Sequence, residues 1–579
     1  MAKTASIPAP TGGWNVRDSL MMMKPTEAVA LVNWWPTPVD VQIRKGYIQW
    51  ATGLPGTVDT IMAYNGSAGA RKLWAITSTG SLYDVSSSGA VGAPVITGLS
   101  NGQWQYVSYA TPGGQFILAC NGVDAMLRYN GTAWVAITNG TGAVISSLTG
   151  NGTLSTATTA TPHGLLTGNT VTVTGASVVG FNVGPVAVTR VSATVFTYLS
   201  GGTPSATGAV YGSAEAITGV DPKSISTLNM FKNRLWLVQK NSQSVWYLPA
   251  LAIQGAAVEF PLGSLYPAGG YLQSMGTWTI DVGVGIDDNC AFFSSEGEIL
   301  IYKGTDPASA STFALVGLFK QGNPIGVRCQ IKYLGDVYVI TDLGVAPMSS
   351  SILTAQVTMK SDLTDKILPA MQTAVQLARN LFGWQMIAYP SANMLLVNVP
   401  TTGSSYQFAM NTITGAWTKF TGWNARCWEA QGNNLYFGGA GFVGQAWSTN
   451  GDVGMAIISN TLPAFTDMKS PARLKKMSMV RPVLYSDGTP SVLIGMNFDY
   501  DQITQPTGLL AFASPGGGMT WGSMSWGSMT WGGSLAPNAN WQYAGGIGRT
   551  VSMAIAVSNN VSEVRWAAAD YVYELGGIL

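Results

Sequence analysis

Five basic side chains gather at one point of the chain, and Asp467 is the one acidic residue near them. They are Lys469, Arg473, Lys475, Lys476 and Arg481. Cations in such a group contact phosphates without reading base sequence, so the cluster suits a channel that carries a polyanion, or an acidic partner. A solvated sheet edge protected by lysines is an equally good interpretation. In a strand, Arg473 and Lys475 would share one face.

A second group is aromatic and lies in the segment MTWGSMSWGSMTWGGS. Trp521, Trp526 and Trp531 recur with a period of five, and each is followed by glycine. This period fits neither one face of a strand nor one stripe of a helix, so each Trp-Gly pair is predicted to form its own turn. Indole rings in such a loop can stack on sugars, contact another subunit or pack on one another. We favour contact within an assembly.

Asp499 and Asp501 form the carboxylate pair with a spacing suited to acid–base chemistry. Two apart in a strand, they would share a face, and glycoside hydrolysis needs two carboxyl groups roughly 5 to 9.5 Å apart. A turn at the end of a strand is a more common place for such a pair. The sequence has no P-loop, GxSxG, HExxH or EF-hand motif. We therefore predict that the protein is not an enzyme.

The sequence offers few residues that could bind a metal or a cofactor. The single histidine, His163, lies in a turn marked by Pro and Gly, which excludes a His-rich metal site. The cysteines form no CxxC pair, and we expect buried thiols rather than zinc ligands or disulfides. They are Cys120, Cys290, Cys329 and Cys427. No metal and no cofactor is predicted.

The chain that must position these groups carries unusually little charge. Only 10% of its 579 residues are charged, against about 25% in an average soluble domain. Such a chain either lies in a membrane or buries surface in an assembly. No apolar run approaches the roughly 18 to 20 residues of a spanning helix, and the N-terminus has no apolar signal region, so we expect an assembly. With a net charge of +1, the chain as a whole has no strong electrostatic attraction to nucleic acid.

Short aromatic hairpins recur along the chain. In Lys72–Ser86 two strands meet at Thr79-Gly80, and in Gln115–Gly131 two meet at Asn121-Gly122. Five similar units follow at Arg234–Leu248, Cys290–Gly304, Val337–Ser349, Met394–Asn411 and Asn434–Ser448. Repeated meanders of this kind predict a β-propeller, and a pair of stacked β-sandwiches is the alternative.

Other segments interrupt or flank the hairpins. Between Arg128 and Glu215 the one formally charged residue is Arg190, and Thr-rich strands there predict an inserted small sandwich or barrel. Apolar spacing predicts one helix near 361–380, with Ser361 or Thr364 as its N-cap. We expect a platform segment at 1–55, blades at 56–140, the insert at 141–212, further blades at 213–460 and a C-terminal β domain at 461–579.

Several of these segments together resemble the tail nozzle, or tail tubular protein B, of short-tailed bacteriophages. The resemblance lies in GGWNVRDSL, AVALVNWWPTPVDVQIRKGY, WQYVSYATPGGQFILACNGVDAMLRYNG, GNPIGVRC, VYVITDLGVAPMS, KSDLTDKILPAM, RPVLYSDG, the tryptophan repeat and ELGGIL. It spans most of the chain, and its motifs are packing and turn motifs rather than catalytic ones.

The resemblance implies a mainly β fold, with a propeller body, the inserted β domain, the helix and a β-rich platform formed by the chain termini. It also implies a structural virion protein: a ring of six copies below the portal and adaptor, whose channel retains packaged DNA and conducts it into the host. Double-stranded DNA would pass without specific contacts, and tail fibres or spikes are further candidate partners. We also predict that the basic cluster faces the channel, because its five positive charges have few acidic residues near them.

Two other functions remain open at this stage. One is a tail adhesin that holds host polysaccharide through the tryptophan repeat and the propeller loops. The other is a polysaccharide-cleaving enzyme that uses Asp499 and Asp501.

Overall fold

The computed structural model describes residues 2–140, 143–281, 286–333, 335–349, 363–510 and 535–578. The chain divides into two compact units. The terminal unit contains both ends of the chain and consists of Met1–Trp50, Met359–Gly439 and Val443–Leu579. The internal unit consists of Ala51–Thr358 and Ala440–Phe442.

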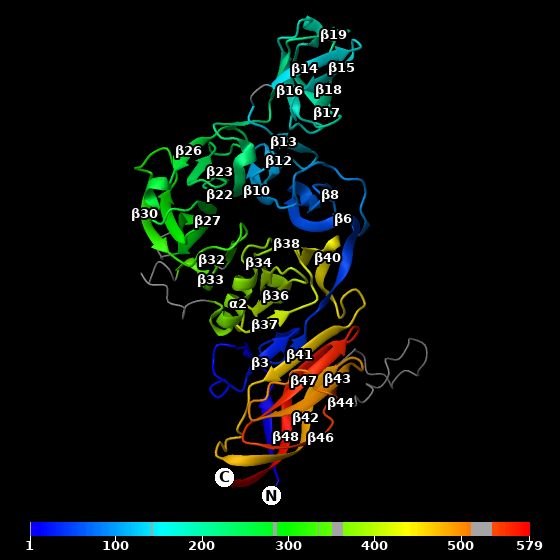
Figure 1. Ribbon diagram of the computed structural model, residues 1–579, viewed down its shortest axis with the longest axis vertical. Helices are drawn as coiled ribbons and strands as arrows, with labels where there is room; N and C mark the ends of the chain where they lie inside the picture. Colours follow the sequence, from blue (N-terminus) through cyan, green and yellow to red (C-terminus); the bar gives the residue numbers. More distant parts are fainter. Residues whose placement is uncertain are drawn as a thin grey trace, which may run out of the picture. The chain divides into compact units, whose positions relative to one another are not determined.

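Within its described residues, the internal unit contains five small antiparallel meanders (Figure 1). Gly-containing turns produce them, as at Gly80 and Gly122, which hold φ of +74° and +71° between successive strands.

The first meander is the later part of β6 (Gly46–Asn65), β7 (Arg71–Thr77) and β8 (Leu82–Asp84). The second is β10 (Gln105–Thr111), β11 (Gly114–Cys120), β12 (Met126–Tyr129) and β13 (Trp134–Ile137). The third is β22 (Ile225–Phe231), β23 (Arg234–Gln239), β24 (Ser244–Tyr247) and β26 (Val258–Pro261). The fourth is β27 (Leu272–Asp281), β28 (Ile286–Ser294), β29 (Glu298–Gly304) and β30 (Phe313–Lys320). The fifth is β31 (Gln330–Tyr333), β32 (Asp336–Thr341) and β33 (Gly344–Pro347).

Each meander packs on the next through an apolar core, and each large side chain buried there contributes about 1.5–3 kcal/mol. The successive cores contain Trp74 with Trp134, Leu118 with Leu237, Trp236 with Phe292, and Ile301 with Val339. Small meanders stacked in chain order are the blades of a β-propeller. The predicted propeller body is confirmed.

Arg328, in the loop before β31, ties the fifth blade to the first two. Its guanidinium donates to the backbone oxygen of Asp59 at 3.2 Å, to Thr60 Oγ1 at 2.7 Å and to the backbone oxygen of Trp104 at 2.8 Å. One side chain thus joins segments more than 200 residues apart in the sequence.

The insert is a closed antiparallel barrel. Six of its seven strands pair in a ring and remove the open edges that a sandwich would keep. In order around the ring they are β14 (Ala143–Gly150), β15 (Leu154–Thr159), β18 (Val195–Leu199), β17 (Val183–Arg190), β16 (Thr170–Thr174) and β20 (Val210–Ser213), which returns to β14. Phe181, Phe196 and Tyr198 fill the interior. Of the two predicted forms, sandwich or barrel, the structure has the barrel.

The terminal unit contains two more meanders of the propeller type. One is β34 (Gln385–Tyr389), β35 (Met394–Val399), β36 (Tyr406–Asn411) and β37 (Trp417–Phe420). The other is β38 (Cys427–Gln431), β39 (Asn434–Gly438) and the part of β40 (Ala440–Thr449) that lies in this unit.

The predicted helix is α2 (Leu368–Ala378), which buries Met371, Ala374, Val375 and Ala378. The expected cap at Thr364 is wrong. Ile367 precedes the helix and Thr364 precedes the short turn η6 (Asp365–Ile367), and neither position has a side-chain cap. Pro369 in the first turn fixes φ where no backbone N–H is needed, so the helix starts without one. Ser361 lies outside the described residues.

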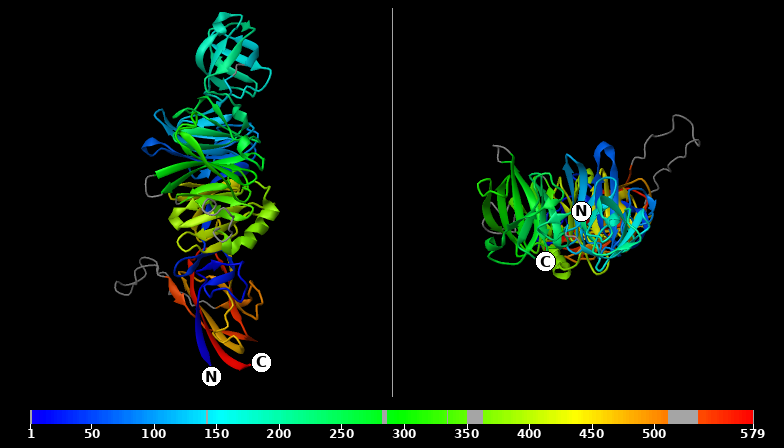
Figure 2. Two further views of the ribbon diagram at one scale, coloured as in Figure 1. Left: turned by 90° about the vertical axis from the view of Figure 1, so that its left-hand side faces the viewer. Right: turned by 90° about the horizontal axis from the view of Figure 1, so that it is seen from above.

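Two sheets form the platform of the terminal unit, with Trp34 and Trp566 6.1 Å apart in the core between them. The first sheet contains β1 (Lys3–Pro8), β4 (Trp34–Pro36), β5 (Val41–Ile43), β42 (Arg473–Ser486), β45 (Ala536–Asn538), β46 (Gln542–Gly548) and β48 (Val564–Ile578). The second contains β3 (Glu27–Val32), β41 (Ile457–Pro463), β43 (Ser491–Phe498), β44 (Gly508–Leu510) and β47 (Val551–Asn559), with β2 (Gly13–Trp14) beside β3. This sheet continues into the β34–β37 meander, because β3 also pairs with β37. β1 pairs with β48, so the two ends of the chain lie side by side (Figures 1 and 2). The predicted platform of chain termini is confirmed.

Candidate functional site

The basic cluster lies on and just before β42, and its members have different environments. Lys475 is fully buried, and its Nζ donates to the backbone oxygens of Ser470 at 2.5 Å and Arg549 at 2.6 Å. Burial lowers the pKa of Lys475, and the negative charges of Asp467 and Asp499 partly offset this decrease. The prediction that Lys475 shares a face with Arg473 is wrong, because the register shifts between them and leaves Arg473 exposed. Lys475 is therefore a structural residue and cannot present its charge to a channel.

Arg481 is also engaged in the fold. Its Nε donates to Asp570 Oδ2 at 2.7 Å, and its guanidinium lies 4.6 Å from the ring centre of Trp541. The exposed members of the cluster are then Lys469, Arg473 and Lys476. The three tryptophans of the repeat, Trp521, Trp526 and Trp531, lie outside the described residues.

The carboxylate pair does not lie on a strand face. β43 ends at Phe498, and Asp499 and Tyr500 hold φ of +46° and +72° in a tight turn. Asp499 Oδ1 accepts from the backbone N–H groups of Arg549 at 2.6 Å and Thr550 at 3.1 Å. This carboxylate fixes a turn, which removes the geometric basis for a catalytic pair with Asp501.

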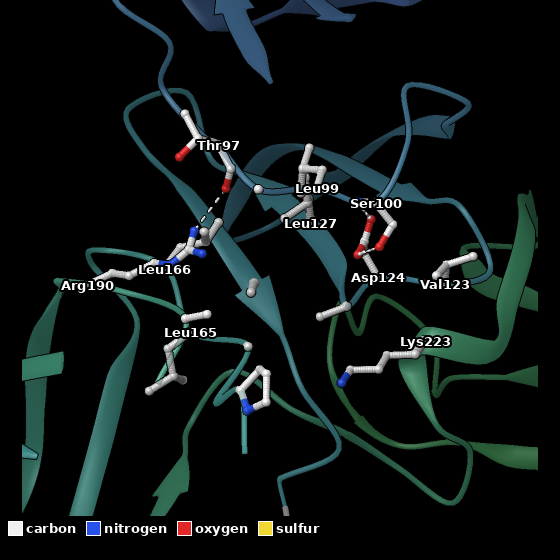
Figure 3. Close-up of a pocket in the computed structure, with 16 residues that line it drawn as sticks. Thr97, Leu99, Ser100, Val123, Asp124, Leu127, Leu165, Leu166, Arg190 and Lys223 are labelled. Atoms are coloured by element: carbon white, nitrogen blue, oxygen red, sulfur yellow. Dashed lines mark hydrogen bonds between the residues drawn. The ribbon is translucent and has the colours of Figure 1, made fainter. Parts of the chain in front are cut away.

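A pocket lies in the internal unit, between the insert barrel and the second blade (Figure 3). It has a volume of about 290 Å³. Its walls come from the loop at 97–100, the turn at 123–125, strands β12 and β13, the barrel loop at 162–166, and η3 (Pro222–Ser224). Leu127, Ala136, Leu165 and Leu166 give it an apolar floor.

Three charged side chains line this pocket. Arg190, at the end of β17, donates from Nη1 to the backbone oxygen of Thr97 at 3.0 Å and from Nε to that of Ser192 at 3.4 Å. Lys223 extends its ammonium toward the cavity (Figure 3). The carboxylate of Asp124 is already occupied, because it accepts from Ser100 N and Oγ and from Asn121 Nδ2 at 2.7–2.8 Å.

His163 lines an adjoining pocket of about 260 Å³. Its Nδ1 accepts from the backbone N–H of Leu165 at 3.0 Å, so Nε2 carries the hydrogen and donates to the backbone oxygen of Ser192 at 3.1 Å. Burial lowers the pKa of His163, which favours the neutral ring. The histidine thus shapes the barrel loop rather than carrying charge.

Buried amide contacts fasten the barrel to the blade beside the pocket. Asn169 is fully buried and bonds both backbone groups of Ala136, donating at 2.7 Å and accepting at 3.1 Å. Its Nδ2 also donates to Glu215 Oε2 at 3.1 Å. The insert barrel and the second blade therefore hold the pocket walls in place together.

The sequence did not predict this pocket. One signal was present, since Arg190 is the one formally charged residue between Arg128 and Glu215. Its pairing with the distant Thr97 could not be deduced without the fold.

Among the residues that the structure describes, no three His, Cys, Asp or Glu side chains are grouped to hold a metal ion. The four cysteines are buried thiols, and burial raises the pKa of Cys329 to about 11. No helix in the described ranges is long and apolar enough to cross a membrane.

No family model and no curated protein matches the chain. Solved structures that resemble it include YCF48 bound to a D1 peptide, at 11% identity and a TM-score of 0.25, covering 72% of this chain and 94% of that one. Sqt1 of Saccharomyces cerevisiae has 9% identity and a TM-score of 0.33, covering 69% and 98%. The β-propeller domain of Swd1 from Myceliophteria thermophila has 10% identity and a TM-score of 0.23, covering 68% and 100%. Likenesses this distant say nothing of function, and the propeller assignment stands on the sheets and cores described above.

Proposed function

We propose that this chain is a structural protein of a short-tailed phage virion, the nozzle of the tail. Six copies form a ring below the portal and adaptor, and the channel of the ring retains DNA and conducts it at ejection. The resemblance of the sequence to tail nozzle proteins supports this proposal. So does the low charge of the chain, because surfaces poor in charge are stable in water when an assembly covers them.

The observation that carries the proposal is two open edges of the first platform sheet, whose strand path also ends at β4 and β45. Among the described strands, β46 pairs with β42 alone, and β1 pairs with β48 alone. β46 carries no charged residue, and it exposes Tyr543 to 87% and Ile547 to 59%. Soluble monomers protect such an edge with charges or proline. Lys3 and Pro8 do so on β1, whereas β46 has neither and is open to pairing with another chain.

The directions of the two edge strands suit a closed ring. Each neighbouring pair in the series β1, β48, β42 and β46 is antiparallel, so β46 and β1 also run in opposite directions. Rotation about an axis roughly along the strands would bring β46 of one copy beside β1 of the next in antiparallel register. Repeated contacts of this head-to-tail kind close into a ring when the rotation divides a full turn.

The exposed cations Lys469, Arg473 and Lys476 belong to the same sheet region, and we propose that they face the channel. Three cations per copy would attract DNA without binding it firmly, because each phosphate contact is weak and exchanges with salt. Arg473→Gln would then change the rate of DNA ejection, and an outward location of the three in a ring structure would contradict this assignment.

The test is the mass and shape of the purified protein, alone and with portal and adaptor. We expect rings with an axial hole and a mass several times 60.8 kDa. Ile547→Lys on β46 should prevent ring formation. Ile458→Lys is the matched control, because Ile458 is 62% exposed on a strand inside the other platform sheet. A chain that stays monomeric in all these mixtures would contradict the nozzle.

A further inference from the structure

The pocket beside Arg190 has no role in the proposed ring, and its lining points to a ligand. Its floor of leucine and alanine side chains is almost fully buried, and charged and polar side chains complete the lining. Its volume of about 290 Å³ is just below the roughly 300 Å³ at which the range for small-molecule sites begins. The pocket therefore has room for a single ring-sized group.

The charge available to such a ligand is positive. Asp124 is the one acidic side chain in the lining, and its two oxygens already accept three hydrogen bonds from Ser100 and Asn121. Lys223 forms no side-chain bond to any described residue. Asp221 accepts a hydrogen bond from the backbone N–H of Lys223, not from its side chain. The ammonium is directed at the cavity (Figure 3).

Arg190 supplies the second cation. Thr97 and Ser192 hold its Nη1 and Nε, and this fixes the guanidinium at the wall of the pocket. Its Nη2 lies beside Gly98, and a Cβ atom added to that glycine would be 3.4 Å from this nitrogen. The described residues offer this Nη2 no acceptor, so it is a free donor in a preorganised position.

We propose that the pocket binds a carboxylate-bearing sugar unit of an acidic polysaccharide. Arg190 Nη2 and Lys223 Nζ would both attract the carboxylate, and the cation that it contacts would form a charge-assisted hydrogen bond with it. The apolar face of the sugar ring would rest on Leu127 and Leu165, and the hydroxyls would reach Ser100 and the backbone groups at 97–100. A DNA backbone does not fit this site, because its phosphates need a row of cations rather than two cations on different walls of one pocket.

The experiment measures binding of methyl glucuronide by isothermal titration calorimetry and by ligand-detected NMR, with methyl glucoside as the neutral counterpart. We expect the acidic sugar to bind and the neutral one to bind about tenfold more weakly or not at all. Lys223→Gln should weaken glucuronide binding about tenfold. Lys320→Gln, an exposed lysine at the end of β30, is the matched control and should leave binding unchanged.

Arg190→Lys and Arg190→Gln complete the test, with circular dichroism to verify the fold. Lysine keeps the charge but not the fork that Thr97 and Ser192 hold, so both variants should weaken binding, and glutamine more so. Equal binding of the two sugars, binding unaffected by Lys223→Gln, or binding of inorganic phosphate alone would each overturn the proposal. None of these outcomes depends on whether rings form, so the site and the nozzle are tested separately.

Discussion

Lys475 and Lys476 are sequence neighbours with opposite roles. The ammonium of Lys475 is buried between the carbonyls of Ser470 and Arg549, whereas that of Lys476 is exposed. Lys475→Met leaves both carbonyls without their donor, and we expect the free energy of unfolding to fall by about 1–3 kcal/mol. Lys476→Met should change it by less than about 0.5 kcal/mol. Urea denaturation compares the two variants, and equal losses would contradict this assignment.

Glu27 gives the terminal unit a dependence on pH. Burial alone would raise the pKa of Glu27, but hydrogen bonds from Lys366 at 2.8 Å, Asn15 at 2.9 Å and the Lys24 N–H outweigh it and hold the pKa below 4.5. The ionised group therefore stabilises the fold above pH 4.5, and this contribution disappears as the pH falls through the lowered folded-state pKa.

Glu27→Gln should lower the unfolding free energy at pH 7 and reduce its further decline below pH 4.5, because the group that titrates is gone. Glu574→Gln, at an exposed position of β48, is the control and should follow the wild-type pH profile. Denaturation at pH 7, 5 and 3.5 makes the comparison. A Glu27→Gln profile parallel to that of the wild type would show that Glu27 is not the titrating group.

Single residues could be predicted from the sequence where their environment is local. The burial of the four cysteines followed from their apolar surroundings. The opposite faces of Arg473 and Lys475 could not be predicted, since they depend on a bulge opposite β48. The free cation Lys223 was missed for the same reason, because the barrel that completes its pocket is distant in the sequence until the chain folds.

At the scale of elements, hairpins were predictable and distant pairings were not. The hairpin expected at Lys72–Ser86 is β7 and β8, with Gly80 in its turn. Alternating apolar residues and a Gly turn act over a few residues, so they are visible in one sequence. The pairing of β1 with β48 spans nearly the whole chain, and no local pattern marks it.

The barrel is an element that the propeller should tolerate losing. The two segments that connect the barrel to the blades lie side by side. Thr138 N donates to Glu215 O at 3.0 Å, and Ile217 N donates to Thr138 O at 2.9 Å. Replacing 141–212 by a short Gly-Ser linker should therefore keep the blades folded, with their cooperative unfolding intact. Circular dichroism and limited proteolysis measure this. An unfolded product would mean that Asn169 and Leu166, which pack on the second blade, are required for the blade itself.

At the scale of the whole molecule, low charge determines how copies would hold together. A ring that depended on ion pairs would weaken as salt screens them, over a Debye length of about 10 Å at 0.1 M and about 3 Å at 1 M. The β46 edge has no charge to screen, and β1 carries Lys3 alone. Pairing between these edges would rest on backbone hydrogen bonds and on burial of Tyr543 and Ile547, which salt strengthens slightly or leaves unchanged.

We therefore expect the ring fraction at a fixed low protein concentration to stay constant or rise between 0.05 and about 1 M sodium chloride. Mass photometry measures this fraction directly. Urea at concentrations below unfolding should lower it, because urea solvates both peptide and apolar groups. Rings that dissociate in salt would place the contact at the exposed cations Lys469, Arg473 and Lys476 instead of at the sheet edges. That result would leave the nozzle proposal standing and move these cations from the channel to the subunit interface.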